Sequence, residues 1–418
     1  DEEQENTYKS ERTPKYNAKD VAIFRCKYNK ALFLMTSATP SIESYSNALK
    51  GKYTLCSLTQ RYGDAKLPQV ITVDMKQEMK NGNKSPISAI LKEQIAETLD
   101  ENKQVILLIN RRGYNTFIAC NDCGHVITCP NCSISLTYHS TNNRLTCHYC
   151  GYTKKLDNVC PECGGDNIRY SGYGTQRIED ELSFLFPNAK ILRMDADTTS
   201  TKFSHEKMFN AFANHEYDIM IGTQMVAKGL DFDDVTLVGV VNADNSLYDE
   251  SYNSAERTFD LITQVVGRSG RRDNSGKAII QTINPYNQTL ECAAQQDYET
   301  FYANEIELRR LLIYPPYCDI ISASFVSDNE NKTAMCAKKF FEILVDMNEE
   351  YKQKIIILGP NASKIAKLNN NFRYSLFVKC KNSKIIRTLF SETLKKLSKI
   401  REYKDVSVSL DLNPYDLN

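Results

Sequence analysis

Eight cysteines near the middle of the chain form four Cys-x-x-Cys pairs, a spacing that suits metal binding. The pairs are Cys120/Cys123, Cys129/Cys132, Cys147/Cys150 and Cys160/Cys163. Two residues between the thiolates let one tight turn direct both sulfur atoms at the same ion. Glycine, which tolerates a positive φ, follows three of the pairs. Eight thiolates complete two tetrahedral sites with no position open for water, so we expect two structural Zn2+ ions.

Other interpretations of these cysteines are weaker. Disulfide bonds require an oxidising compartment, and the six remaining cysteines are scattered singly, as in reduced proteins. A redox motif does not occur four times in succession, and an iron–sulfur cluster fits the ligands but not four similar turns. The spacing leaves open which pair joins which; one solution is a nested arrangement of the first pair with the fourth. No apolar run approaches the length of a membrane span and no signal peptide is present, so we expect a cytoplasmic protein without a membrane partner.

Two short polar stretches near the start of the chain have the residue types of a nucleotide-driven motor. In Asp1-Glu2-Glu3-Gln4, an aspartate can hold Mg2+ and the adjacent glutamate can orient an attacking water. In Thr36-Ser37-Ala38-Thr39, hydroxyl groups can relay the state of the nucleotide to a nucleic acid. Each stretch alone is also compatible with an acidic terminus or a plain loop.

Two further stretches later in the chain add phosphate-binding chemistry. In I-G-T-Q-M-V-A-K-G-L-D-F (221–232), Thr223 and Gln224 can donate to phosphates and Asp231 can position a nucleotide hydroxyl. In Q-V-V-G-R-S-G-R-R (264–272), two arginines three apart can present guanidinium groups, which stay charged and bind phosphate bidentately. The alternative for the last stretch is a basic helix C-terminus that complements the helix dipole.

The elements around these stretches predict an α/β domain. Leu32–Met35 has the pattern of a buried strand, and 74–84 that of a linker. Ser85-Pro86 can start a helix with Leu91, Ile95 and Leu99 on one face, before a strand at 105–109. After the cysteines, strands at 190–194, 218–221, 235–241 and 277–282 alternate with helices at 177–185, 203–214 and 254–266. Such alternation implies a parallel sheet covered by helices on both faces, with the zinc segment as an insertion.

The pattern changes after a helical stretch at 295–313 and the pair Pro315-Pro316. Strands at 320–326, 354–358, 372–379 and 406–410, with helices at 332–348 and 383–400, give the order β-α-β-β-α-β of a ferredoxin-like domain. The whole chain is balanced, with 52 basic and 52 acidic residues. Residues 364–404, however, contain twelve Lys or Arg and two acidic residues, a net charge of +10. This stretch favours either nucleic-acid phosphates or a solvated helix face.

Taken together, these motifs resemble the primosomal protein N′ (PriA) family of replication-restart helicases. The resemblance rests on D-E-E-x, T-S-A-T-P-S, N-R-R-G-Y (110–114), the eight cysteines, G-T-Q-M-x-x-K-G-x-D-F and E-R-T-F-D-L-x-T-Q-V-x-G-R-x-G-R. Y-P-P-Y (314–317) and G-P-N-A-S-K-I (359–365) continue it toward the C-terminus. It implies a superfamily 2, 3′ to 5′ DNA helicase with a RecA-like lobe, ATP with Mg2+, and branched and single-stranded DNA as substrates. It also implies primosome proteins and single-stranded DNA-binding protein as partners.

The resemblance carries over residue by residue. It assigns catalysis to Asp1, Glu2, Gln264, Arg268 and Arg271, nucleotide binding to Glu3, Gln4, Gly229 and Asp231, and coupling to Thr36, Ser37 and Thr39. It implies DNA contacts at Arg111, Arg112, Tyr114, Thr223, Gln224, Arg373, Tyr374 and Lys379. It also implies nested zinc sites, with Cys120, Cys123, Cys160 and Cys163 on one ion and the inner four cysteines on the other.

The sequence departs from the family pattern in three ways. Gln4 stands where the family usually has His, Ser269 stands where it usually has Ala, and no G-x-x-x-x-G-K-[ST] phosphate loop is present. We therefore expect this chain to be part of a longer protein and to be inactive as an ATPase alone. We expect four parts: 1–84, a remnant of the first helicase lobe with a linker; 85–118 with 169–300, the second lobe; 119–168, the zinc insertion; and 301–418, a DNA-binding domain. The competing hypothesis is a non-enzymatic scaffold for DNA binding and primosome assembly.

Overall fold

A parallel sheet forms the centre of the larger lobe in this computed structural model, which describes residues 1–58, 68–109, 117–139, 143–157, 159–170, 175–194, 204–223, 226, 232–267 and 276–415. The strand order is β1-β11-β10-β2-β9-β8, and all neighbouring strands run parallel. The strands are β1 (Gln69–Asp74), β2 (Gln104–Leu108), β8 (Ile191–Met194), β9 (Ile219–Gly222), β10 (Val235–Val240) and β11 (Lys277–Thr282). This sheet confirms the predicted α/β lobe.

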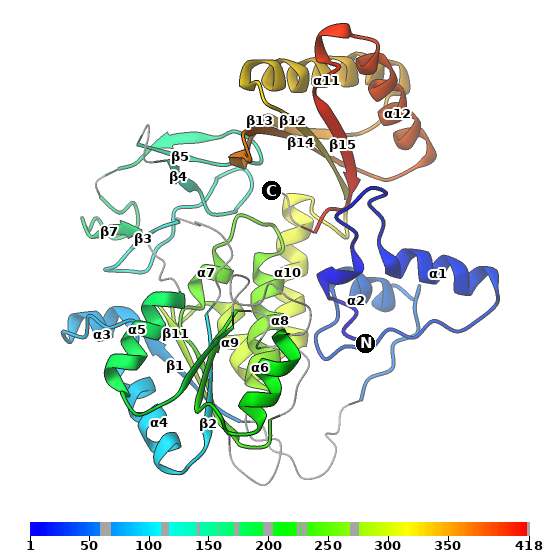
Figure 1. Cartoon of the computed structure of the whole chain (residues 1–418). Helices are drawn as coiled ribbons and strands as arrows, with labels where there is room; N and C mark the ends of the chain where they lie inside the picture. The colour runs from blue at the N-terminus through cyan, green and yellow to red at the C-terminus, as the bar shows by residue number, and fades with distance from the viewer. Residues whose placement is uncertain are drawn as a thin grey trace.

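Helices cover both faces of the sheet (Figure 1). One face packs on α4 (Ala89–Asp100) and α5 (Thr175–Leu185), with α3 (Met75–Lys80) following β1. The opposite face packs on α6 (Ser204–Ala213), α8 (Ser254–Val266), α9 (Gln288–Gln295) and α10 (Tyr298–Leu312), and the short α7 (Asp244–Leu247) precedes α8. Every residue of β2 is buried, as expected for a strand covered on two faces.

Three local predictions were wrong. Residues 74–84 are not a linker, because β1 ends at Asp74 and α3 follows it, so the sheet begins before residue 85. The helix predicted to start at Ser85-Pro86 begins at Ala89, since the side chain of Ser88 accepts the amide of Leu91 as its cap. Leu32–Met35 forms no strand, and Leu32 and Leu34 are 90% and 71% exposed, because no described strand lies beside them.

The C-terminal domain has the predicted ferredoxin-like fold. Its antiparallel sheet has the order β13-β14-β12-β15 and consists of β12 (Asp319–Ser327), β13 (Ile356–Leu368), β14 (Asn371–Cys380) and β15 (Ser407–Leu412). Helices α11 (Glu330–Tyr351) and α12 (Lys384–Ser398) pack on one face through a core that includes Phe325, Phe340 and Phe390. β13 does not end at residue 358 as predicted but continues through Gly359-Pro360, with shifts in its register against β14.

The cysteine-rich segment forms a separate module between β2 and α5. Its small sheets consist of β3 (Ile118–Cys120) with β7 (Ile168–Tyr170), and of β4 (Thr137–His139), β5 (Arg144–Thr146) and β6 (Thr153–Lys155). The module lies between the parallel sheet and the C-terminal domain (Figure 1). We call the part from Phe117 to Tyr170 the zinc module.

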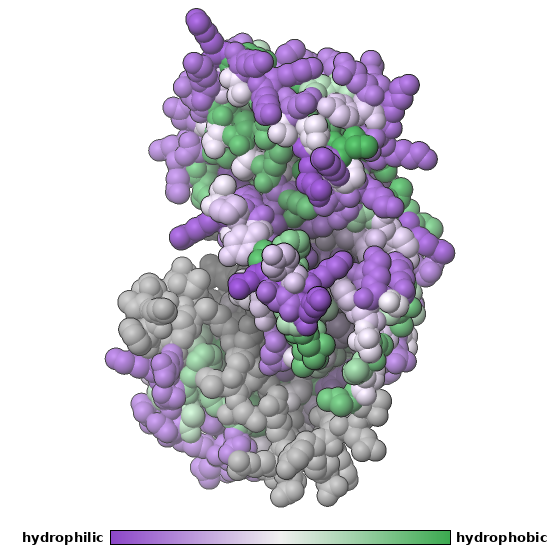
Figure 2. Space-filling model, turned by 90° about the vertical axis from the view of Figure 1, so that its right-hand side faces the viewer, coloured by the Kyte–Doolittle hydropathy of each residue, from purple (hydrophilic) through white to green (hydrophobic). Residues whose placement is uncertain are grey.

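The N-terminal segment, residues 1–58, lies against α8 and α10 and carries α1 (Ala18–Tyr28) and α2 (Ile42–Leu49). None of the residues of α1 is buried, and Phe24 and Tyr28 are 70% and 81% exposed. Hydrophobic side chains are visible among hydrophilic ones on the face shown in Figure 2. Among the described residues, no helix combines the length and apolar character needed to cross a bilayer.

A buried acid next to the contact between the two domains gives a pH prediction. Glu250 follows Asp249, which accepts a hydrogen bond from Lys364 of β13. Burial raises the pKa of the Glu250 carboxyl to about 8, Asp249 adds to the rise and Lys364 opposes it. The folded chain therefore binds more protons than the unfolded chain between about pH 4.5 and 8, so stability falls as the pH rises through this window.

We expect Glu250→Gln to be more stable than the wild type at pH 8.5, by roughly 2–3 kcal/mol, and nearly equal to it at pH 5. Urea denaturation at both pH values measures this difference. Glu349→Gln, on the exposed surface of α11, is the control that should match the wild type throughout. An equal effect of Glu250→Gln at the two pH values would contradict the assignment.

Candidate metal centres and motor site

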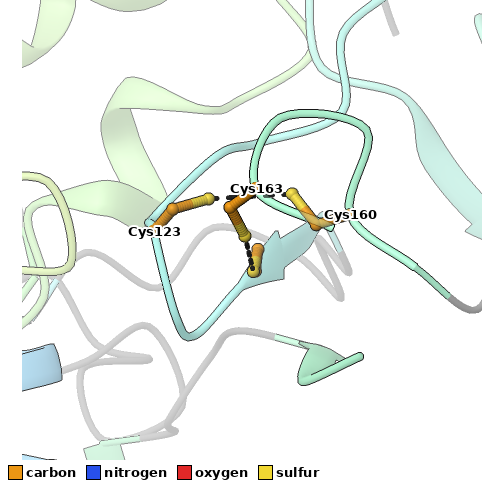
Figure 3. A group of neighbouring side chains, drawn as sticks. Cys123, Cys160 and Cys163 are labelled. Carbon is orange, nitrogen blue, oxygen red and sulfur yellow. Dashed lines mark hydrogen bonds between the residues drawn. The ribbon is translucent and has the colours of Figure 1, made fainter. Parts of the chain in front are cut away.

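The structure gathers the eight cysteines into two groups of four in the nested arrangement. One group consists of Cys120, Cys123, Cys160 and Cys163, the other of Cys129, Cys132, Cys147 and Cys150, and within each group all Sγ atoms lie within 4.8 Å of one another. Figure 3 shows the side chains of Cys123, Cys160 and Cys163 turned toward a common point. We call the first group the outer cluster and the second the inner cluster.

The spacing of the sulfur atoms fits zinc. The Sγ atoms are 3.7 Å apart for Cys120 and Cys163, 3.6 Å for Cys123 and Cys160, and 3.6 Å for Cys129 and Cys150. Tetrahedral zinc with bonds of about 2.3 Å separates its sulfur ligands by about 3.8 Å. Four sulfur ligands leave no open coordination position, so the clusters support structural rather than catalytic zinc.

The four Cys-x-x-Cys turns share one backbone conformation. In each, the amide of the residue after the second cysteine donates to the carbonyl of the first cysteine, at 2.8 to 2.9 Å. That residue has a positive φ in every case: 81° at Gly124, 53° at Ser133, 77° at Gly151 and 73° at Gly164. Ser133 therefore adopts the same conformation without the freedom of glycine, and the glycine pattern in the sequence reveals only three of the four equivalent turns.

Each cluster lies against a different neighbour. At the outer cluster, Lys76 of α3 donates to the carbonyl of Cys123 at 3.1 Å. At the inner cluster, the side-chain amide of Asn361 on β13 donates to the carbonyl of Tyr149 at 3.1 Å. A Cβ on Gly151 would lie 2.6 Å from Asn361 Oδ1, so this turn fits the strand closely. The zinc module thus connects the parallel lobe to the C-terminal domain.

The first two motor motifs meet in the N-terminal segment. Thr36 Oγ1 donates to Asp1 Oδ1 at 2.9 Å, and Ser37 Oγ donates to Gln4 Oε1 at 2.6 Å. Ser37 Oγ also accepts the amide of Thr39 at 2.9 Å. The hydroxyl groups of Thr36 and Ser37 are therefore both hydrogen-bonded to the first motif.

Helix α8 of the parallel lobe contacts the first motor motif. Gln264 Nε2 donates to Glu2 Oε2 at 3.3 Å, and Gln4 Nε2 donates to the same oxygen at 2.7 Å. Gln264 lies in the last turn of α8, 262 positions along the chain from Glu2. Two of the residues assigned to nucleotide chemistry thus donate to the carboxylate of a third.

Glu3 differs from the prediction that it binds nucleotide. Its carboxylate accepts hydrogen bonds from the amide and hydroxyl of Ser41, from Ser44 Oγ and from Lys19 Nζ, and it is 4% exposed. Burial alone would raise its pKa, but Lys19, 2.7 Å away, and the Ser41 donors hold the pKa below its usual value. Glu3 therefore holds the start of α2 in place and is withdrawn from the nucleotide site.

One of the predicted DNA contacts in the C-terminal domain is also corrected. Lys379 is 7% exposed and donates to the carbonyl of Leu312 at 2.7 Å, with its Nζ 3.6 Å from the ring centroid of Tyr314. Burial lowers its pKa. Tyr374 is only partly buried where it packs against the core of this domain, so its predicted DNA contact stays a prediction. Arg373, directly before Tyr374 on β14, is partly exposed.

Of the remaining residues predicted to bind nucleotide, phosphate or DNA, the structure describes only Thr223. Thr223 directly follows β9 at the carboxyl end of the parallel sheet, where ligands bind in such folds. Arg111, Arg112, Tyr114, Gln224, Gly229, Asp231, Arg268 and Arg271 lie outside the described residues.

A buried arginine that the sequence analysis missed connects the N-terminal segment, α8 and α10. Arg309 is 1% exposed and forms ion pairs with Glu43 at 3.2 Å, Glu256 at 2.6 Å and Glu305 at 2.8 Å. Burial disfavours its charge, but the three carboxylates raise its pKa well above the usual value. Glu256 also accepts the amide of Ile42 at 2.8 Å, at the start of α2. No local sequence motif predicts this cluster of Arg309 and three glutamates, because its members come from three distant segments.

Comparison with known proteins supports the assignment of these parts. Family models match residues 129–155 (PriA DNA helicase Cys-rich region domain), 154–273 (helicase conserved C-terminal domain) and 310–415 (primosomal protein N C-terminal domain). The replication restart protein PriA of Bacillus subtilis is 44% identical over 99% of this chain and 51% of its own length. That of Borreliella burgdorferi is 36% identical over 100% of this chain and 61% of its own length.

Solved structures add little to this comparison. Yeast Dbp5 bound to RNA and ADP BeF3 covers 71% of this chain and 58% of its own chain, with 12% identity and a TM-score of 0.34, which is too low to support an argument. The chain spans about half the length of the PriA protein of B. subtilis. By its cysteine-rich region, its C-terminal domain and its identity to these relatives over nearly all of its residues, the chain matches the C-terminal portion of the PriA replication restart proteins.

Proposed function

We propose that this chain is part of an ATP-dependent superfamily 2 DNA helicase that acts in replication restart and primosome assembly at branched DNA. The observation that carries the proposal is the meeting of Gln264 with Glu2 at 3.3 Å. Motor enzymes of this class bind nucleotide between two lobes, so residues from both must converge on the phosphates. Here a residue of α8 and a residue of the N-terminal segment share one hydrogen bond, which supports the proposal.

The residues then divide the chemistry as follows. Asp1 would hold Mg2+, Glu2 would orient the attacking water, and Gln264, Arg268 and Arg271 would bind the phosphates. Bound Mg2+ neutralises charge on the phosphate oxygens. Thr36 and Ser37, which donate to Asp1 and Gln4, pass a change at the nucleotide into the loop that leads to α2. Gly229 and Asp231 complete the nucleotide site from the second lobe.

DNA binding is assigned to the surface of the C-terminal domain and to the loops at the carboxyl edge of the parallel sheet. Lys384, Arg387, Lys395 and Lys396 are exposed along α12, Lys399 is exposed directly after it, and Arg373 lies on the adjoining sheet. Arg111, Arg112, Tyr114, Thr223 and Gln224 provide contacts from the parallel lobe. Primosome proteins and single-stranded DNA-binding protein are the partners we propose, in the reducing cytoplasm that the eight thiolates require.

ATP hydrolysis measured with and without forked DNA tests the proposal. We expect the 418-residue chain to bind forked DNA without turning over ATP, because it has no phosphate-loop sequence. A form extended upstream to the full length of its relatives is expected to hydrolyse ATP with stimulation by DNA. In that form, Glu2→Gln should lower turnover at least about 100-fold, since it removes the group that orients water, while leaving DNA affinity unchanged.

The scaffold hypothesis predicts a different result. In that case the extended form binds forks without turnover, and Glu2→Gln and Arg268→Ala leave every measured property unchanged. DNA-stimulated hydrolysis by the 418 residues alone would instead contradict the expected dependence on the phosphate loop.

A further inference from the structure

The end of the chain contacts the loop that follows the first motor motif. Lys9 Nζ donates to the carbonyl of Leu412 at 2.8 Å and lies 2.6 Å from Asp411 Oδ1, at the end of β15. The side chains of Lys9 and Asp411 are 9% and 12% exposed, so water screens this ion pair less than a surface pair. Lys15 approaches the other oxygen of Asp411 at 3.7 Å. Figure 1 shows the N-terminal loop rising to the last strand of the C-terminal domain.

Three residues beyond β15, the chain contacts α8. The guanidinium carbon of Arg257 lies 5.4 Å from the ring centroid of Tyr415. Tyr415 also lines a cavity of about 30 Å³ together with Gln4 and Gln264, the two residues that donate to Glu2. Arg257 is held by Asp249 at 2.7 Å, and Asp249 in turn accepts a hydrogen bond from Lys364 of β13.

These two contacts involve the two elements that meet at the candidate nucleotide site, the N-terminal segment and α8. Lys9 belongs to the segment that continues directly from Asp1–Gln4, and Tyr8 in the same segment donates to the carbonyl of Asp1 at 2.7 Å. Arg257 lies on the helix that carries Gln264, two turns away. If β15 moves relative to the parallel lobe, its contact with Lys9 would displace the loop that follows Asp1. The contact of Tyr415 with Arg257 would displace α8, which carries Gln264.

We propose that Asp411 and Tyr415 are positioning residues that transmit the state of the C-terminal domain to both sides of the nucleotide site. Asp411 acts through Lys9, and Tyr415 acts through Arg257. A nucleic acid that binds the C-terminal domain and moves β15 changes the alignment of Glu2 with Gln264. The expected effect on ATP turnover rests on the proposed function, whereas the contacts of Asp411 with Lys9 and of Tyr415 with Arg257 do not.

Hydrogen exchange on the 418-residue chain tests the contact without any need for ATPase activity. We expect Asp411→Asn to speed amide exchange in residues 1–10 at least fivefold, and Tyr415→Ala to do the same in residues 254–267. Asp405→Asn is the matched control, because Asp405 pairs with Lys332 on an exposed surface of the same domain. The charge-reversed pair Lys9→Asp with Asp411→Lys should restore most of the protection. Unchanged exchange in residues 1–10 of Asp411→Asn would overturn the proposal.

Kinetics of the upstream-extended protein test the transmission. Asp411→Asn and Tyr415→Ala are expected to lower DNA-stimulated kcat by fivefold or more, with little change in the DNA concentration at half-stimulation. A change in DNA affinity alone would refute transmission and place both residues in the DNA-binding surface. If the wild type shows no turnover, the proposed function fails, and the exchange experiment still decides whether the contact exists.

Discussion

Replacing Cys147 by serine is expected to reduce the zinc content of the purified chain from two ions to one and to release the zinc module from the C-terminal domain. Cys147 is fully buried in the inner cluster, within a hydrophobic cluster that also contains Tyr314, Ile320 and Phe377. Structural zinc contributes roughly 10–16 kcal/mol of apparent binding free energy at such sites, and a module this small has little other core. Loss of the ion therefore removes most of the free energy that keeps these turns folded.

The effect should depend on which cluster is changed. Cys163→Ser in the outer cluster, where Cys163 is exposed, also leaves one zinc but disturbs the side of the module that faces α3. We expect this variant to keep the contact of Tyr149 with Asn361, which Cys147→Ser loses. Cys56→Ser changes an exposed cysteine outside both clusters and should retain two zinc ions.

Elemental analysis and limited proteolysis measure these outcomes. Cleavage after Lys154 or Lys155 is expected to become rapid in Cys147→Ser and to stay slow in Cys56→Ser. Two zinc ions in Cys147→Ser, or fewer than two in the unchanged chain, would contradict the assignment of two four-cysteine sites. Treatment of the wild type with a chelator should reproduce the proteolysis pattern of the cysteine variants.

The parts that were predictable from sequence are those whose information is local. Four Cys-x-x-Cys turns specify their own backbone conformation, and alternating strands and helices specify a parallel sheet through burial on both faces. The pairing of the turns depends on how the chain returns between Cys132 and Cys147, so spacing alone left it open and only the resemblance supplied the nested order. The structure brings the cysteines together in that order.

The predictions that were wrong depend on distant partners. Lys379 lies in a basic stretch, but Tyr314 and the carbonyl of Leu312, which precede β12 and are more than 60 residues away in sequence, contact it. Leu32 and Leu34 have the hydrophobicity of a strand without a described strand beside them. Arg309 gave no signal because an arginine before Tyr-Pro-Pro-Tyr has no distinguishing pattern until its three carboxylates are assembled.

That assembly makes Arg309→Met the substitution with the largest expected effect among single changes outside the clusters. It leaves Glu256 and Glu305, both largely buried, without their cation, and removing one partner of a buried ion pair destabilises a protein by about 3–5 kcal/mol. Because Glu256 also accepts the amide of Ile42, the junction of α2 with α8 should loosen as well. We expect a lower midpoint in urea denaturation and faster hydrogen exchange in residues 42–49.

The neighbouring arginine is a matched control. Arg310 pairs with Glu307 on an exposed surface, and exposed ion pairs contribute only about 0–1 kcal/mol. Arg310→Met should therefore change the free energy of unfolding by less than about 1 kcal/mol. Equal effects of the two substitutions would show that Arg309 contributes through its hydrophobic stem alone.

The pH dependence separates loss of charge from loss of packing. Burial, together with Glu256, already raises the pKa of Glu43 in the wild type against the opposing effect of Arg309, and burial likewise raises that of Glu305. Without Arg309, the folded-state pKa values of these carboxyls rise further above the unfolded value near 4.5, so the protonated forms favour the folded state. The penalty in Arg309→Met is then fully present above those raised values and disappears as the pH falls toward 4.5. A cavity or packing defect would instead persist at low pH, so a constant difference between pH 5 and pH 8 would exclude unpaired charge as the cause. We expect the free energy of unfolding of Arg309→Met to recover near pH 5, and that of Arg310→Met to stay close to the wild type. These two results would identify the carboxylates as the groups whose repulsion Arg309 suppresses where the N-terminal segment, α8 and α10 meet.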